Sequence, residues 1–147
     1  METFERILVK HNCVRRTDKP IAHFEDIENI IGFKLPPDYR LFLETYCGFE
    51  EFIGEAYVRL WGMDEIIDQN QGYGVFENLP ATLAIGGNGG GEFIAITIID
   101  EGNYRIVISP FIDLNEEYHV EIGSSFTDFL ERLNNGHGYF DNIDLKK

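Results

Sequence analysis

Residues 85–99 read Ile85-Gly86-Gly87-Asn88-Gly89-Gly90-Gly91-Glu92-Phe93-Ile94-Ala95-Ile96-Thr97-Ile98-Ile99, a glycine-dense segment followed by the most apolar run of the chain. The run from Phe93 to Ile99 carries no charge, and most of its side chains are β-branched or aromatic. A short run of this kind is typical of a central strand that is buried on both faces. Glycines permit a tight turn and close backbone approach, so they suit the entry to such a strand. We therefore expect the rest of the chain to pack around residues 93–99.

A glycine-rich segment also raises the question of phosphate binding. A P-loop needs Lys and then Ser or Thr after its last glycine, with a helix to follow. Here Glu92 follows, and then the predicted strand. The dinucleotide-binding pattern G-x-G-x-x-G also fails, because a start at Gly87 places Glu92 at the third glycine. A carboxylate at that place would repel a phosphate, so we interpret the segment as a structural turn.

The chain has 147 residues, which predicts one domain spanning residues 1–147. No apolar run approaches the length of a membrane-spanning helix, and the first residues do not resemble a signal peptide. Cys13 and Cys47 are too few for a disulfide framework and are expected to be reduced thiols. These features predict a cytoplasmic protein without a membrane partner.

The formal net charge of −14 is unevenly distributed. Residues 1–20 contain 5 basic and 3 acidic side chains, whereas residues 21–147 contain 7 basic and 23 acidic ones. This charge disfavours nucleic acid as a partner, because nucleic-acid affinity depends on Lys and Arg at the phosphates. It favours a basic protein partner, whose approach would be steered electrostatically. The alternative is the ordinary acidic surface of a soluble protein.

Apolar periodicity gives the order of secondary structure. We predict helices at residues 3–12, 24–31 and 35–48, then an acidic turn at 50–55 and a strand at 57–61. A short helical turn at 62–70 and an irregular segment at 71–80 precede strands at 82–85, 93–99, 104–109 and 117–122. A last helix starts at Ser124 and stops at Asn135-Gly136. The fold class is α+β, with a largely antiparallel central sheet flanked by N-terminal helices and a C-terminal helix. The tail beyond that helix is expected to be an edge segment or partly disordered.

Four pieces of the chain, in this order, resemble the SUKH superfamily of small domains, which is typified by a yeast cell-wall-synthesis regulator and many bacterial immunity proteins. The resemblance covers residues 25–133 and leaves 134–147 as a tail. One departure is visible, because the family commonly has Asn-Gly-Gly where this chain has Tyr46-Cys47-Gly48-Phe49-Glu50. The matching pieces are Leu35-Pro36-Pro37-Asp38-Tyr39-Arg40-Leu41-Phe42-Leu43; Leu60-Trp61 with Glu65-Ile66 and Asn70; Ile85 to Glu92; and Ile122-Gly123-Ser124-Ser125-Phe126-Thr127-Asp128-Phe129-Leu130.

The resemblance implies a non-enzymatic bacterial immunity protein that needs no cofactor. Such a protein binds and neutralises a cognate toxin domain, often a nuclease or deaminase of a contact-dependent or polymorphic toxin system. The acidic charge agrees with this function, because it would complement a basic nucleic-acid-binding cleft. The alternative is a general intracellular protein-interaction or regulatory module without a toxin partner. Sequence does not fix the oligomeric state.

A hydrolase is a third class, and we predict no catalytic, cofactor-binding or metal-binding residues. The four histidines lack zinc-site spacing, and Ser124-Ser125 lacks the second glycine of a nucleophile elbow. The sequence alone leaves open a catalytic Cys–His pair whose two members meet only in the folded protein. The histidines are His11, His23, His119 and His137.

An acidic cluster between residues 44 and 77 provides the candidate partner-binding surface. It contains eight acidic side chains and a single basic one, Arg59, together with several aromatic residues. Aromatic anchors within an acidic rim suit a tight interface with a basic protein. For Trp61 we favour a place in the core, because large aromatic residues on strands usually pack inward. The candidate partner-binding residues are Glu50, Glu51, Glu55, Asp64, Glu65 and Asp68.

Overall fold

The computed structural model describes residues 1–141 and contains one sheet in the order β1-β2-β3-β4-β5-β6. Each strand pairs antiparallel with its neighbour, so the sheet order is also the chain order. β1 and β6 are therefore the two edges of the sheet. The strands are β1 (Phe49–Ile53), β2 (Ala56–Leu60), β3 (Thr82–Gly87), β4 (Glu92–Asp100), β5 (Asn103–Pro110) and β6 (Val120–Gly123).

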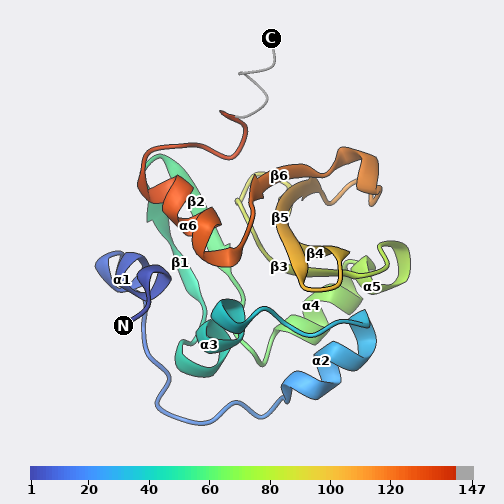
Figure 1. Ribbon diagram of the computed structural model, residues 1–147, viewed down its shortest axis with the longest axis horizontal. Coiled ribbons are helices and arrows are strands. Elements are labelled where there is room, and N and C mark those ends of the chain that lie inside the picture. Colours follow the sequence, from blue (N-terminus) through green and yellow to red (C-terminus); the bar gives the residue numbers. More distant parts are fainter. Residues whose placement is uncertain (142–147) are drawn as a thin grey trace.

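Six helices and one 3₁₀ turn accompany the sheet in the described part of the chain. In Figure 1, α6 lies across the sheet with α1 and α3 close to it, while α4 and α5 lie beside β3. This arrangement confirms a single α+β domain with N-terminal helices, an antiparallel sheet and a C-terminal helix. The helices are α1 (Thr3–Lys10), α2 (Phe24–Ile31), α3 (Pro37–Thr45), α4 (Ile66–Gly72), α5 (Val75–Asn78) and α6 (Phe126–Asn134), and the 3₁₀ turn is η1 (Glu116–Tyr118).

The central strand predicted from the apolar run is β4. Its side chains alternate between the two faces of the sheet, so Ile94 and Ile96 lie on one face while Phe93 and Ala95 lie on the other. All four are fully buried, which confirms a strand covered on both sides. The last residues of β4 are not buried. Ile99, next to the hairpin turn into β5, is 61% exposed.

The C-terminal helix α6 begins at a side-chain cap and buries an aromatic face. The Ser125 hydroxyl oxygen accepts a hydrogen bond from the Asp128 N–H at 2.9 Å, and the Asp128 carboxylate accepts one from the Ser124 N–H at 2.8 Å. These bonds satisfy backbone groups that a helix start leaves unpaired. The ring of Phe126 packs edge-on against Phe4 of α1 and Tyr39 of α3, with ring centres 5.6 and 5.2 Å apart.

Three local predictions need correction. The expected acidic turn at 50–55 is strand β1 followed by a two-residue turn at 54–55, because Phe49 and Ile53 are buried at its ends. The segment 71–80 is not irregular throughout, since it contains the one-turn helix α5. The turn between β3 and β4 is also shorter than the glycine-rich segment, because β3 continues through Gly87.

The described part of the tail, up to residue 141, packs against the domain. Residues 137–141 form no strand, and the expectation of an edge segment is wrong for this part. Tyr139 is buried, and its hydroxyl donates a hydrogen bond to the Tyr57 carbonyl oxygen at 2.6 Å. The contact attaches the end of the chain to β2. Residues 142–147 lie outside the described residues.

Candidate functional site

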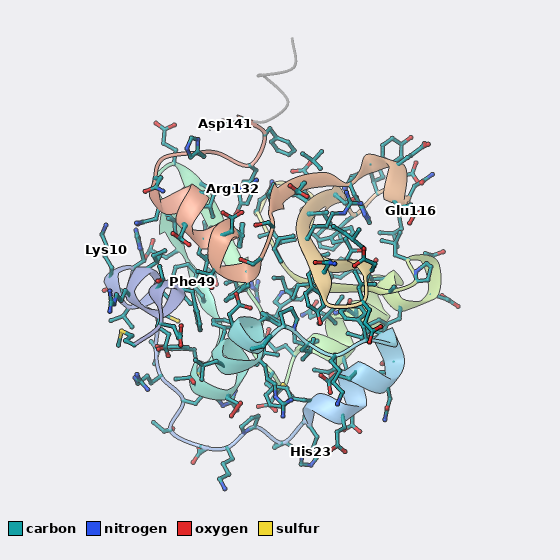
Figure 2. All side chains as sticks on the ribbon, in the orientation of Figure 1. Lys10, His23, Phe49, Glu116, Arg132 and Asp141 are labelled. Atoms are coloured by element: carbon teal, nitrogen blue, oxygen red, sulfur yellow. The ribbon has the colours of Figure 1, made fainter. Side chains whose placement is uncertain are left out.

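The hairpin formed by β1 and β2 has one buried face and one open face. Glu50 lies opposite Arg59, and Phe52 lies opposite Tyr57, so these four side chains share the open face. Phe52 is 54% exposed and contacts the Tyr57 ring edge-on at 5.3 Å. On the other face, Phe49, Ile53, Val58 and Leu60 are buried. Figure 2 shows Phe49 among the side chains in the interior of the molecule and Lys10 at its periphery.

A hydrogen bond links the two strands across the open face. The Tyr57 hydroxyl donates to the Glu50 carboxylate, and this bond, followed by partial desolvation and the Glu50 charge, raises the pKa of Tyr57. Tyr57 therefore stays protonated near neutral pH and keeps the Glu50 carboxylate in place. The open face carries one fixed carboxylate and one exposed aromatic ring, which a protein partner could contact.

A cleft of about 310 Å³ lies beside the β1–β2 hairpin, and we call it the acidic cleft. Three of the predicted partner-binding residues, Glu50, Glu51 and Glu65, line it. Arg59, the basic residue of β2, also lines the cleft. The fold thus gathers carboxylates from β1 and from the residue before α4.

The acidic cleft also contains a histidine and both cysteines, so it is the place to test a Cys–His pair. The His11 Nδ1 atom lies 2.9 Å from the Ile7 carbonyl oxygen, and the Cys13 thiol donates to the Gly48 carbonyl oxygen at 3.4 Å. Burial raises the pKa of Cys13 to about 12, so this residue is a neutral thiol near pH 7. No hydrogen bond joins His11 to Cys13 or Cys47 within residues 1–141. The cleft therefore lacks the nucleophile–base contact that thiol catalysis requires.

A second cleft of about 380 Å³ is also lined by Arg59, and we call it the aromatic cleft. Three rings that line it, Phe111, Tyr73 and Trp61, form a continuous series with Phe93 of the core. Phe93 contacts Phe111 at 5.1 Å, Phe111 contacts Tyr73 at 4.2 Å, and Tyr73 stacks on Trp61 at 6.4 Å. Phe93 is fully buried, whereas Tyr73 is 49% exposed. The aromatic cleft is also lined by Tyr57, Gln69, Glu92 and glycines of the β3–β4 turn.

Trp61 belongs to the core, as predicted. It is 5% exposed, whereas the ring of its neighbour Tyr73 is half exposed to solvent. The sequence interpretation missed Tyr73 and Phe111 because they lie in segments without a clear period. The sequence does show many aromatic residues in an acidic protein, but composition does not indicate which rings contact one another.

The other three predicted partner-binding residues lie apart from the acidic cleft. Glu55 is at the tip of the hairpin and lines a hollow with Gly136 and Tyr139 of the tail. Asp68 is exposed on α4. Asp64 is engaged within the chain, where its carboxylate accepts hydrogen bonds from the Arg16 guanidinium at 3.0 Å and from the Ile21 N–H at 2.9 Å.

The contacts of Asp64 change its acidity. Desolvation raises its pKa, but the hydrogen bonds from Arg16 and from the Ala22 and Ile21 N–H groups, with the Arg16 charge, outweigh this effect. The net result is a pKa below the ordinary value for Asp. Asp64 is therefore ionised at neutral pH and fixes the loop before α2, while the positive charge of Arg16 partly offsets its negative charge.

Within residues 1–141 there is no group of three or more His, Cys, Asp or Glu side chains arranged to hold a metal ion. None of the helices in the same range has the length and apolar character needed to cross a bilayer.

The model of the SMI1 / KNR4 family (SUKH-1) matches residues 21–132, which is most of the chain. The chain belongs to this family. In this SUKH-1 protein the pieces quoted from the sequence fall on α3, on the end of β2 with α4, on the end of β3 with the β3–β4 turn, and on β6 with α6. SUKH proteins are known for immunity functions and are generally non-enzymatic immunity or regulatory proteins with protein partners. No curated protein matches this SUKH-1 chain.

Proposed function

We propose that this SUKH-1 protein is a bacterial immunity protein that acts in the cytoplasm. It binds a cognate toxin domain in stoichiometric amounts and thereby blocks the toxin. The toxin is a basic nuclease or deaminase domain of a contact-dependent or polymorphic toxin system. The observation that carries this proposal is the grouping of Glu50, Glu51 and Glu65 around one cleft in a protein with a net charge of −14.

The open face of the hairpin suits such a partner on physical grounds. Carboxylates accelerate the encounter with a basic surface and select against acidic partners. An exposed aromatic ring such as Phe52, which buries a large apolar area on contact, lengthens the lifetime of the complex. The chain itself needs no catalytic group for this function, because an inhibitor acts by covering the site of another protein.

The first experiment identifies the partner. The tagged protein is used to capture binding proteins from a lysate of its own cells, at low and then at high salt, with mass spectrometry of the retained proteins. The retained protein is then expressed with and without the SUKH-1 protein. We expect a basic protein that arrests growth alone and does not when the SUKH-1 protein is present.

The second experiment locates the surface by charge reversal. Glu50→Lys combined with Glu51→Lys is expected to weaken binding of the captured toxin by about tenfold or more and to flatten its salt dependence. The matched control is Glu116→Lys with Glu117→Lys, which changes the net charge equally on η1. Figure 2 shows Glu116 on the side of the molecule away from Phe49 of β1. Equal losses for both pairs would mean that only total charge matters.

A different partner would change the assignment. Capture of a partner that is neither basic nor toxic would favour a general protein-interaction or regulatory module. Unchanged affinity of the Glu50 and Glu51 double variant for a real toxin would exclude the acidic cleft as the binding surface, while immunity itself would remain supported.

A further inference from the structure

The outer edge of β1 has backbone groups that face away from the sheet. Within the described residues 1–141 β1 pairs with β2 alone, and a two-residue turn joins the strands between Ile53 and Ala56. In such a hairpin the pair next to the turn is hydrogen-bonded, and the pairs then alternate along the strands. The N–H and C=O groups of Phe52 and Glu50 therefore point outward, away from β2.

Two contacts agree with this alternation. On β2 the same rule directs the Tyr57 carbonyl away from β1, and this oxygen accepts the hydrogen bond from Tyr139. On β1 the Phe52 N–H donates to the carboxylate of its neighbour Glu51 at 3.0 Å, instead of to another strand. Within residues 1–141, no backbone-to-backbone hydrogen bond reaches β1 from outside the hairpin.

The charges around this edge decide what could cover it. Glu50, Glu51 and Glu55 belong to the strand and its turn, and Phe52 is exposed on the open face. A second copy of the chain would bring the same carboxylates against each other, and like charges on adjacent strands are destabilising. An extended segment with Lys or Arg side chains would instead place opposite charges side by side, with an apolar residue against Phe52.

We propose that the outer edge of β1 accepts an extended basic segment of the partner as an additional strand of the sheet. This inference rests on the proposed function, because the segment belongs to the toxin domain. Glu51 acts as a movable cap in this arrangement. It satisfies the Phe52 N–H in the free protein, and it is released to a Lys or Arg of the incoming strand when that N–H bonds to the partner backbone.

The test uses peptides, so it does not depend on finding the toxin. A displayed library of random peptides of about eight residues, the length of an ordinary strand, is selected on the folded protein at low salt. Synthetic copies of the enriched peptides are then titrated calorimetrically into the wild type, Glu50→Ala and Glu50→Pro. Both variants lose the same carboxylate, but only proline also removes the outward N–H. Since that N–H does not bond to β2, proline leaves the hairpin ladder intact.

We expect enriched peptides that carry Lys or Arg where they face Glu50 and Glu51 and an apolar residue where they face Phe52. Glu50→Ala should weaken their binding a few-fold, and Glu50→Pro should weaken it by about tenfold more, the effect of one lost hydrogen bond. Circular dichroism checks the fold of both variants. As a second measurement, hydrogen exchange on the wild type should show that the peptide slows exchange of the Glu50 and Phe52 amides by about tenfold or more.

Three results would overturn the proposal. They are equal affinities for Glu50→Ala and Glu50→Pro with no slowed exchange at the edge, no enrichment of peptides that contain Lys or Arg, and a concentration-dependent dimer of the chain that Glu50→Pro abolishes. The outcome is separable from that of the proposed function. If charge reversal weakens toxin binding while proline equals alanine, the immunity function stands and strand pairing fails. If the peptides pair at the edge and no toxin exists, the edge is a site for another basic partner.

Discussion

The side-chain amide of Asn70 hydrogen-bonds to both backbone groups of Ala84. Its Nδ2 atom donates to the Ala84 carbonyl oxygen at 2.9 Å, and its Oδ1 atom accepts from the Ala84 N–H at the same distance. Nδ2 also donates to the Ile66 carbonyl oxygen within α4 at 2.8 Å. In this way Asn70 takes the place of a neighbouring strand where β2 and β3 separate, since β2 pairs with β3 only at Arg59 and Leu60.

Replacement of Asn70 by Ala should therefore destabilise the protein markedly. Asn70 is fully buried, and its loss leaves the N–H and C=O of Ala84 without partners in the core. An unsatisfied buried group costs about 1–3 kcal/mol, so we expect Asn70→Ala to lower the free energy of unfolding by about 3 kcal/mol. Urea denaturation measures the change. The control is Asn78→Ala, which removes an exposed hydrogen bond from the side-chain amide to the Gly74 carbonyl oxygen and should cost about 1 kcal/mol or less. Similar effects for both variants would contradict this account of Ala84.

Gly86 is the position in the glycine-rich segment where a side chain would fit worst. A Cβ atom added there would lie 1.8 Å from the Arg59 carbonyl oxygen, so β2 and β3 could not approach as they do. We expect Gly86→Ala to cost about 3 kcal/mol of unfolding free energy, because the clash is with backbone and must move a strand. Gly90→Ala is the matched control, since its new Cβ would have an ordinary contact of 3.5 Å with Asn88 Oδ1. Equal urea midpoints for the two variants would show that β2 can move away from the new Cβ atom without loss of stability.

The elements predicted correctly are those whose own apolar pattern determines their structure. The helix at 24–31 and the helix predicted from Ser124, which is α6, each have a single buried face, and residues 93–99 are apolar enough to need cover on both sides. β1 was missed because it is an edge strand with an acidic centre, in which only Phe49 and Ile53 show the inward face. Helix α5 was missed because one turn is too short to show a period.

The candidate site was predictable in composition but not in arrangement. The cluster of acidic residues is visible in the sequence, and the fold does bring Glu50, Glu51 and Glu65 to one cleft. Nothing in local spacing shows that Asp64 binds Arg16, because that contact depends on a loop that returns to the start of α4. The site therefore depends on long-range contacts, which a pattern of near neighbours does not contain.

Asp64 gives the clearest dependence of stability on pH. The pKa of Asp64 is lowered in the folded protein, chiefly by hydrogen bonds from Arg16, Ala22 and Ile21 that outweigh the effect of desolvation. A carboxyl with a lowered pKa stabilises the fold above its unfolded pKa, which is about 3.9 for Asp. That contribution is lost as the pH falls through the lower folded pKa. Because the carboxylate is partly exposed, we expect Asp64→Asn to cost about 1 kcal/mol or less at pH 7.

The measurement compares urea unfolding of the wild type and Asp64→Asn from pH 7 down to about pH 2. The difference between the two proteins should be constant above about pH 5 and should shrink steadily below about pH 4, because only the wild type can lose the charge at position 64. Asp68→Asn is the control, since Asp68 is exposed on α4 and has no hydrogen bond or ion pair within residues 1–141 other than those of the helix backbone. A difference for Asp64→Asn that stays constant to the lowest pH would show that its carboxylate is not what holds the loop.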